Sequence, residues 1–522
     1  MASCINGGEL QVRVVSRRLV QASDESLRPH VLAVSNLDLL PQTIQVSMFC
    51  IYPKPPTSAG RRFPRRRRGL RRRLAVVAQP LLPARRPHRH QPGLRPPGDP
   101  LLQPRPTLAR PTAAAISMTS SRPSPPALPS LLNHFFPLAG RIVTSPCSGL
   151  PEIHCHNQGA ELVVGEADVA LASLDYGAVR ASVGKILLPY AGDVALSVQV
   201  VSFACGGFTV AWGTNHVLVD GSALSMLVGA WSELARSGAL AAGRSTAEPR
   251  PLRVPPTRRA VEFTPLDDGE RQVNVLTSDE SFVARLYYID AAEIARLREA
   301  ASRDGGALAA RVQAVSAYLW KALATAVGAR DERCRMVWWV DGRRRLTSSP
   351  ELRAAMRNYV GNVVTFALVE ATPLPEVVSM VRHAITEPAY DERFQELVDW
   401  VEEHKTKRYM ETVCIGLGSP SVSVTAFASF AYTDFGFGHA AMALPTSSSH
   451  ASRCTGFVQI AARPGGDGSW IVSALVWPRL AAALESGEVL GRIFKPVTAE
   501  YLGLRPATAR PAKWEGMITS KI

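Results

Sequence analysis

Short runs in which apolar and polar residues alternate recur along both halves of the chain, and this period of two predicts β-strands. Between these runs, apolar residues return every three or four positions, as in an amphipathic helix. One such stretch places Leu224, Leu227 and Val228 on the same side. The predicted strands are 10–15, 43–52, 197–201, 208–213, 282–289, 336–340, 422–430, 456–462 and 470–476. The predicted helices are 128–136, 222–234, 291–301, 312–327, 373–386 and 396–405.

Strands and helices alternate in both halves without a strict β-α-β order, which predicts an α/β protein. A chain of 522 residues, 46% of them hydrophobic, is too long for one ordinary core, so two domains are expected. The Pro-rich stretch 249–256 is typical of a linker between them. The expected division is an N-terminal domain at 1–60 and 128–243, an insertion at 61–127, a crossover linker at 244–275 and a C-terminal domain at 276–522.

The formal net charge of +15 comes from one segment. Residues 61–123 hold 16 Arg, no Lys and one acidic residue, Asp99, so the other 459 residues sum to zero. A basic surface that attracts nucleic acid is therefore not a property of the rest of the chain. We expect no nucleic-acid partner for the folded body.

The insertion 61–127 also carries 14 of the 40 Pro residues, which prevent regular helix and sheet, so we expect irregular or disordered structure there. Three interpretations compete. The segment is an RNA- or membrane-binding arm, although Phe63 is its only aromatic residue for stacking on bases. It is a solvated loop without a role. Or it is not native coding sequence, because Arg without Lys is typical of GC-rich nucleotide sequence read in the wrong frame. The third interpretation is favoured.

Several classes of protein are disfavoured by the absence of their signals. The first residues lack the basic and apolar regions of a secretory signal, and no apolar run reaches the ~20 residues of a membrane helix. The eight Cys are scattered without a C-x-x-C pair, which predicts reduced thiols in a cytoplasmic protein and no metal site. No glycine-rich phosphate loop and no G-x-S-x-G is present.

His216 and Asp220 stand in the run Asn215-His-Val-Leu-Val-Asp-Gly221, the one H-x-x-x-D in the chain. A neutral imidazole at the end of a strand is suited to general-base work near pH 7. The alternative is a core histidine with both nitrogens satisfied. Asp220 either orients His216 or pairs with an arginine elsewhere, and the structural role is favoured.

Asp434-Phe-Gly-Phe-Gly438 follows a predicted apolar strand. A kinase D-F-G is excluded because the chain lacks the glycine-rich loop, the V-A-I-K lysine and the H-R-D loop. Two glycines that alternate with aromatic residues indicate a close-packed bend. Asp341-Gly-Arg343 and Tyr359-Val-Gly-Asn362 are two further polar clusters that, taken alone, predict turns.

Together these elements resemble the plant BAHD acyl-CoA-dependent acyltransferases, whose hallmarks are H-x-x-x-D-G and D-F-G-W-G. Phe437 stands here in place of the family's Trp. The order and spacing agree from about residue 8 to 60 and from 128 to 504, whereas 61–127 is several times longer than the family's connection. The matching elements are Ser35-Asn-Leu-Asp38, Phe136-Pro-Leu-Ala-Gly-Arg141, His216 to Gly221, Asp341-Gly-Arg343, Gly361-Asn362 and Asp434 to Gly438.

The resemblance implies two similar domains of mixed sheet plus helices, like chloramphenicol acetyltransferase, with the active-site channel at their interface. His216 would lie in the channel as the general base. Asp220 would point away and support the histidine loop through an arginine, for which Arg343 is the candidate. The turn of Asp434, Phe435, Gly436, Phe437 and Gly438 would shape the coenzyme A side.

The implied activity is that of a cytoplasmic, monomeric acyltransferase (EC 2.3.1) of plant specialised metabolism. Acyl-CoA would be a co-substrate rather than a bound cofactor, and the acceptor would be an alcohol, phenol or amine. His216 would take the acceptor's proton as it attacks the thioester, without an acyl-enzyme. The alternatives are a nucleic-acid-binding protein that uses the Arg-rich arm, and a catalytically inactive relative that acts as a binding module.

Overall fold

The computed structural model describes the chain in segments that leave out both ends and several internal stretches. The insertion 61–127 lies outside the described residues apart from Ala127, so its predicted disorder and non-native origin stay predictions. The described residues are 10–41, 44–54, 127–180, 182–240, 263–265, 274–277, 282–302, 308–328, 334–371, 377–386, 388–427, 434–435, 438–447, 454–487 and 491–504.

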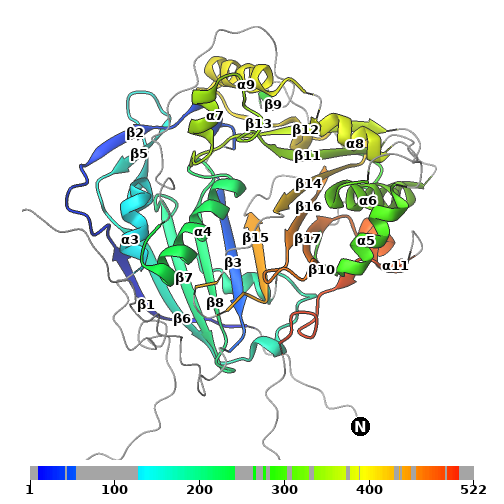
Figure 1. The fold of residues 1–522 in the computed structure, drawn as a ribbon, viewed down its shortest axis with the longest axis horizontal. Helices are drawn as coiled ribbons and strands as arrows, with labels where there is room; N and C mark the ends of the chain where they lie inside the picture. The colour runs from blue at the N-terminus through cyan, green and yellow to red at the C-terminus, as the bar shows by residue number, and fades with distance from the viewer. Residues whose placement is uncertain are drawn as a thin grey trace, which may run out of the picture. The chain divides into compact units, whose positions relative to one another are not determined.

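A mixed sheet forms the first half of the described chain (Figure 1). Its neighbours are antiparallel except for β6 and β7, which run parallel. In spatial order its strands are β1 (Arg13–Val20), β6 (Ala160–Ala167), β7 (Leu196–Phe203), β8 (Phe208–Asn215), β3 (Gln45–Tyr52) and β15 (Met442–Ser447).

A second mixed sheet forms the other half, and in it β14 pairs in parallel with both β11 and β16. Like the first sheet, it combines parallel and antiparallel pairs, and helices cover one of its faces. In spatial order its strands are β12 (Val364–Ala371), β11 (Cys334–Asp341), β14 (Ser421–Phe427), β16 (Thr455–Ala462), β17 (Trp470–Val476), β10 (Val283–Ile289) and β18 (Lys495–Pro496).

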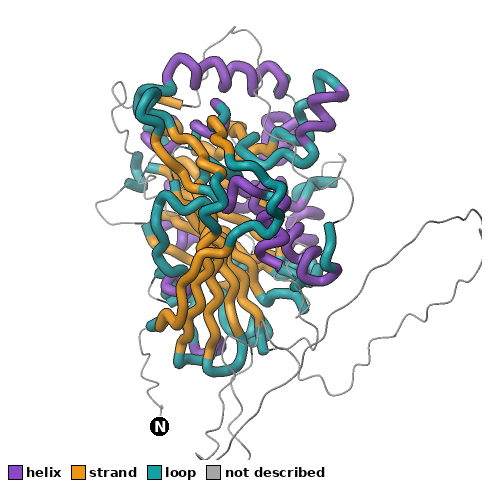
Figure 2. The backbone as a smooth tube through the Cα atoms, turned by 90° about the vertical axis from the view of Figure 1, so that its left-hand side faces the viewer, coloured by secondary structure: helices purple, strands orange, loops and turns teal. Residues whose placement is uncertain are grey.

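Helices cover one face of each large sheet. Each helix has an apolar side, and it buries this side against the sheet. Leu227 of α4 lies in one buried cluster with Met48 and Trp212 of the first sheet, and Leu323 of α6 lies in another with Val458 of the second. Figure 2 shows the strands gathered centrally, with several helices along one side. The helices and 3₁₀ turns are α1 (Asn36–Leu39), α3 (Ala127–His134), η1 (Phe136–Ala139), η2 (Leu171–Ser173), η3 (Val183–Ile186), α4 (Gly221–Ser237), α5 (Ala291–Ala300), α6 (Arg311–Val327), α7 (Pro350–Met356), α8 (Val377–Thr386), α9 (Tyr390–His404), α10 (Thr412–Ile415) and α11 (Pro478–Ser486).

The two halves are joined by a strand exchange and by a shared core. β15 follows the second sheet's β14 along the chain but pairs with β3 of the first sheet (Figure 1). It contains Pro445, which is tolerated because β15 is an edge strand. In addition, α1 contacts α9, and Leu37 of α1 lies in one buried cluster with Leu397 and Val401 of α9. Two smaller sheets are made of β2 (His30–Ala33), β5 (Pro151–Cys155) and β4 (Arg141–Thr144), and of β13 (Tyr409–Glu411) and β9 (Phe263–Pro265).

The α/β class and the two mixed-sheet-plus-helix halves are those predicted from the sequence. Strand β9 lies inside the predicted crossover linker 244–275, most of which is outside the described residues. The ends of several elements differ from the prediction. The helix expected at 396–405 begins earlier, at Tyr390, and the strand expected at 10–15 is β1, Arg13–Val20, most of which is exposed.

Candidate active site

His216 is the first residue after β8, a strand whose eight residues are all buried. The chain turns there, and the His216 backbone N–H donates to the Ile44 carbonyl at 2.7 Å, which anchors the turn to the residue before β3. The His216 side chain is half-buried and lines a cavity between the two large sheets. The strand therefore delivers an imidazole to the boundary of the two halves.

Asn362 fixes the tautomer of His216. The Asn362 amide nitrogen donates to the His216 carbonyl at 2.7 Å and to Asp38 Oδ1 at 3.0 Å, so its Oδ1 is the atom that faces the imidazole. Asn362 Oδ1 lies 2.9 Å from His216 Nδ1. An amide oxygen only accepts, so Nδ1 carries a proton. In the neutral form of the ring, Nε2 is then the nitrogen with the lone pair that can accept a proton.

Asp38 holds Asn362 in turn. Asp38 Oδ1 accepts from the Asn362 backbone N–H at 2.6 Å, and Asp38 Oδ2 accepts from the Ser35 hydroxyl at 2.6 Å in the capping box that starts α1. Asp38 is buried, and burial raises the pKa of its carboxyl against the opposing effect of the Ser35 and Asn362 hydrogen bonds. A chain of contacts therefore runs from Ser35 through Asp38 and Asn362 to His216.

Asp220 points away from this chain. It is the N-cap of α4 and accepts from the Ala223 N–H at 2.8 Å and from the Val363 N–H at 2.9 Å. Among the contacts between described residues, none joins the Asp220 carboxylate to His216. Asp220 is 2% exposed, and its side chain ties the start of α4 to the 359–363 segment.

Arg343 is the partner of Asp220, with its Nη1 2.8 Å from Asp220 Oδ2. Arg343 also donates to the Tyr359 carbonyl at 3.1 Å, to the Gly361 carbonyl at 2.8 Å and to Asp341 Oδ1 at 2.9 Å. Burial acts to lower the pKa of Arg343, but the neighbouring carboxylates of Asp220 and Asp341 outweigh it and leave the pKa raised. The charges are thus compensated inside the interface, which a buried ion pair requires.

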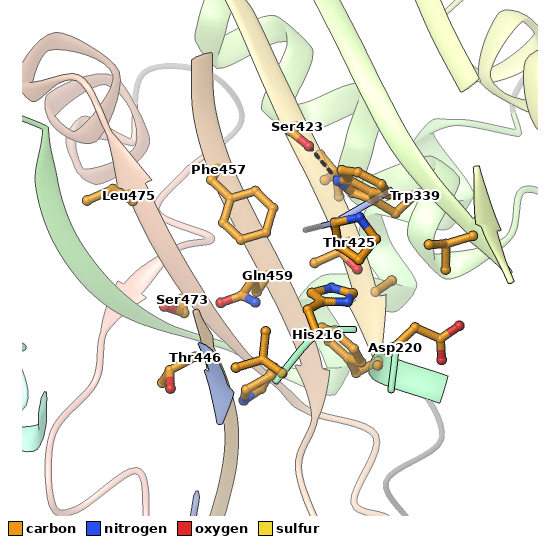
Figure 3. A pocket seen from close by; sticks show the side chains of 18 of the residues that line it. His216, Asp220, Trp339, Ser423, Thr425, Thr446, Phe457, Gln459, Ser473 and Leu475 are labelled. Carbon is orange, nitrogen blue, oxygen red and sulfur yellow. Dashed lines mark hydrogen bonds between the residues drawn. The ribbon is translucent and has the colours of Figure 1, made fainter. Parts of the chain in front are cut away.

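The cavity has a volume of about 1130 Å³. Single small-molecule pockets usually measure roughly 300–1,000 Å³, so there is room for parts of two substrates. Figure 3 shows His216 among side chains from both sheets. The lining includes Val46, Ser47, Leu224, Phe263, Phe282, Trp339, Ser423, Thr425, Thr446, Phe457, Gln459, Ser473 and Leu475.

Polar groups at one part of the lining are already paired with one another. Trp339 Nε1 donates to the Ser423 hydroxyl at 3.0 Å, as the dashed line in Figure 3 marks. The Cys414 thiol donates to Glu411 Oε2 at 3.1 Å. Burial, followed by the nearby Glu411 carboxylate, raises the pKa of Cys414 well above its ordinary value, so the thiol is protonated at neutral pH. Cys414 is thus not a thiolate nucleophile.

The D-F-G-F-G segment contributes a turn and an aromatic anchor. Asp434 Oδ1 accepts from the Gly438 N–H at 3.0 Å, and Gly438 has a φ of 94°, which favours glycine. The Phe435 ring stacks on Trp212 of the first sheet, with centroids 5.8 Å apart. Gly436 and Phe437 lie outside the described residues, so the consequence of Phe in place of Trp stays a prediction.

Sequence reasoning placed His216, Asp220 and Arg343 in one site, and the structure brings them together there. It missed the connection from Asp38 through Asn362 to His216. Both elements, Ser35-Asn-Leu-Asp38 and Gly361-Asn362, were matched to the family and the second also predicted a turn, but neither indicated a contact with His216. Among the described residues, no group of three His, Cys, Asp or Glu side chains could hold a metal ion.

A sequence model of the Transferase family matches residues 125–481. Fatty alcohol:caffeoyl-CoA acyltransferase of Arabidopsis thaliana is 26% identical over 341 residues, which are 61% of this chain and 75% of that protein. Agmatine coumaroyltransferase-1 of Hordeum vulgare is 28% identical over 323 residues, which are 58% of this chain and 72% of that protein.

The fold is also found among solved structures. TRI101 of F. sporotrichioides, complexed with coenzyme A and T-2, superposes with a TM-score of 0.62 at 14% sequence identity. The superposition covers 90% of this chain and 99% of TRI101. At this identity the likeness establishes the shared two-domain α/β architecture.

Proposed function

Because the chain belongs to the Transferase family of BAHD acyltransferases, we propose that it moves an acyl group from an acyl-CoA thioester to an acceptor hydroxyl or amine, with His216 as general base. The observation that carries the proposal is the contact of His216 Nδ1 with Asn362 Oδ1 at 2.9 Å. It selects the tautomer of the neutral ring in which Nε2 has the lone pair, on a residue that lines a cavity with room for parts of two substrates.

We propose the following reaction, which that geometry supports. His216 Nε2 takes the proton of the acceptor as the acceptor's oxygen or nitrogen forms a bond to the thioester carbonyl carbon. The carbonyl oxygen becomes an oxyanion in a tetrahedral intermediate. As the C–O double bond returns, the carbon–sulfur bond breaks, and the imidazolium gives its proton to the departing thiolate. The products are an ester or amide and free coenzyme A.

Asn362 and Asp38 are proposed to position the base. The neutral imidazole becomes an imidazolium during the reaction, and Asn362 keeps the Nδ1 proton throughout, so the same nitrogen accepts and returns the proton. Asp220 and Arg343 are proposed to be structural. Their ion pair joins the start of α4 to the 359–363 segment and so holds Asn362 beside His216.

The proposed donor is a hydroxycinnamoyl-CoA. Support comes from the two relatives, which are named for caffeoyl and coumaroyl groups, and from the aromatic residues Trp339 and Phe457 in the cavity wall. The acceptors of those relatives are a fatty alcohol and agmatine, so both alcohols and amines are proposed. The D-F-G-F-G turn is proposed to shape the coenzyme A side.

We also propose that the protein acts as a cytoplasmic monomer. The described cysteines are free thiols, which supports a reducing compartment. In a separate finding, none of the described helices has the length and apolar character needed to cross a membrane.

The experiment that tests the function is release of free coenzyme A thiol by the full chain. A panel of hydroxycinnamoyl-, acetyl- and malonyl-CoA donors would be combined with alcohols, phenols and amines. We expect release that depends on both a donor and an acceptor. A chain that is folded by circular dichroism yet releases no thiol with any pair would refute the proposal.

A further inference from the structure

Three polar residues form a row across three neighbouring strands of the second sheet. Thr425 of β14 pairs with Gln459 of β16, and Gln459 pairs with Ser473 of β17. Residues that pair across strands put their side chains on the same face, next to each other. We call Thr425, Gln459 and Ser473 the polar row.

The polar row faces the cavity. Because side chains alternate along a strand, the residues on either side of Gln459 point the other way. Val458 and Ile460 lie in the hydrophobic core under the helices, whereas Gln459 lines the cavity. Figure 3 shows Thr425, Gln459 and Ser473 projecting into the same cavity as His216.

The Gln459 residue is largely buried, and its amide makes no hydrogen bond to the described part of the chain. The residue is 8% exposed, and its donor and acceptor atoms open onto the cavity. The fold gives no reason for an amide at this place, because no described residue uses its donor or its acceptor. The unused groups therefore point to a ligand.

A second buried glutamine in the same chain shows the contrast. Gln199 of β7 is 2% exposed, and both ends of its amide are used: its nitrogen donates to the Leu188 carbonyl at 2.6 Å and its oxygen accepts from the Leu188 N–H at 2.8 Å. Gln199 thus ties a loop to the sheet. Gln459 has no such task among the described residues.

The surroundings of the polar row select an uncharged ligand group. Phe457 and Leu475 occupy the neighbouring row on the same face. The row itself offers two hydroxyls and an amide, which exchange hydrogen bonds with a neutral partner but compensate neither a carboxylate nor an ammonium. A charged substrate group would lose its hydration at this place without gaining a counter-ion.

We propose that the polar row is a substrate-recognition subsite that binds a neutral hydroxyl group carried on an apolar or aromatic body. This inference rests on the proposed acyl transfer. The hydroxyl belongs either to the acyl part of the donor or to the acceptor, apart from the reacting group. Gln459 acts as a specificity-determining residue, because its amide binds a substrate that has the hydroxyl more tightly than one that lacks it.

The test compares wild type with Gln459→Leu on substrate pairs that differ by one hydroxyl. The donor arm uses 4-hydroxycinnamoyl-CoA and cinnamoyl-CoA with one acceptor. The acceptor arm uses tyramine and phenethylamine, and an α,ω-diol and its 1-alkanol, with one donor. In the arm whose substrate carries the recognised hydroxyl, we expect the variant's kcat/KM for the hydroxylated substrate to fall about tenfold, which is the effect of one neutral hydrogen bond. The kcat/KM for the substrate that lacks the hydroxyl should stay at the wild-type value.

A stability measurement separates recognition from a structural role. Gln459→Leu should unfold at the same temperature as wild type or higher, because the amide that it removes makes no hydrogen bond to the described part of the chain. The matched control Gln199→Leu should unfold at a lower temperature and leave the substrate preference unchanged. This comparison does not depend on catalysis.

Two results would overturn the inference. One is an equal loss of kcat/KM for both members of every pair, and the other is a preference in Gln459→Leu that is the same as in wild type. Absence of thiol release from wild type with all donors and acceptors would instead refute the proposed function. In that case, a lowered unfolding temperature of Gln459→Leu would also overturn the subsite, because the amide would then be structural.

Discussion

Asn362 Oδ1 accepts the Nδ1 proton of His216 at 2.9 Å, although the two residues are 146 positions apart and belong to different halves of the chain. The same amide donates to the His216 carbonyl and to Asp38. One side chain thus fixes the ring, the backbone and the tautomer of the proposed base. The first half of the chain supplies the proposed base, and the second half selects its tautomer.

Asn362→Ala should reduce kcat more than it raises KM. Without the acceptor at Nδ1, the imidazole can exchange its tautomers and rotate, so the fraction of enzyme with a free Nε2 falls. We expect a loss on the order of 10²-fold, within the range typical of general-base contributions. Steady-state kinetics with a saturating donor would measure it.

The matched control is Asn36→Ala. Asn36 also uses its amide to join the halves, through the Val398 carbonyl at 2.9 Å, but it does not line the cavity. It should affect stability and leave kcat near the wild-type value. A fall in kcat of the same size in both variants would contradict a specific role for Asn362.

Arg343→Ala should destabilise the protein by about 3–5 kcal/mol, because it leaves the Asp220 carboxylate buried without its counter-charge. Asp220→Asn should also lose solubility and folded protein. Chemical unfolding followed by tryptophan fluorescence would measure the change. An Asp220→Asn variant that folds like wild type and is inactive would show that Asp220 orients the base instead.

The titration of Asp38 should make the free energy of unfolding depend on pH. Its pKa in the folded protein is raised above the ordinary value of 3.8, so between these two pKa values the folded state binds more protons than the unfolded state. The stabilising contribution of Asp38 to the free energy of unfolding is therefore fully present below pH 3.8, and it is lost as the pH rises through the pKa of Asp38 in the folded protein. Asp38→Asn does not titrate.

The measurement is the difference in unfolding free energy between Asp38→Asn and wild type at a series of pH values. The unfolding free energy of Asp38→Asn minus that of wild type should increase as the pH rises above 3.8. A difference that stays constant with pH would contradict a raised pKa at Asp38.

The local elements of the fold could be predicted because their patterns are local. The stripe of Leu224, Leu227 and Val228 predicted helix α4, and these residues are buried on its inner face. β15 was missed, since Pro445 interrupts its pattern and its partner β3 lies about 400 residues away in the chain. No local period encodes such a pairing.

One part of the candidate site could be predicted from the sequence, and another part could not. The ion pair of Asp220 with Arg343, expected from the family resemblance, is present. The role of Asn362 could not be derived, because it depends on three contacts that bring Asp38, His216 and Asn362 together from distant parts of the chain. A turn-forming Gly-Asn pair has the same sequence appearance whether or not its amide holds a catalytic ring.

Removal of 61–127 should leave thiol release unchanged. All described residues that line the cavity lie outside this segment, and the remainder of the chain has a net formal charge of zero. The full chain and the shortened chain would be compared at equal folded concentration. If the shortened chain folds but is inactive, the segment has a role in the reaction.

The central claim is that His216 is the general base, and free coenzyme A thiol release by His216→Ala tests it most directly. The account predicts a variant that unfolds like wild type and whose kcat is about 10²–10⁴-fold lower, with a KM near that of wild type. A folded variant that keeps its kcat within a few-fold of the wild-type value would contradict it.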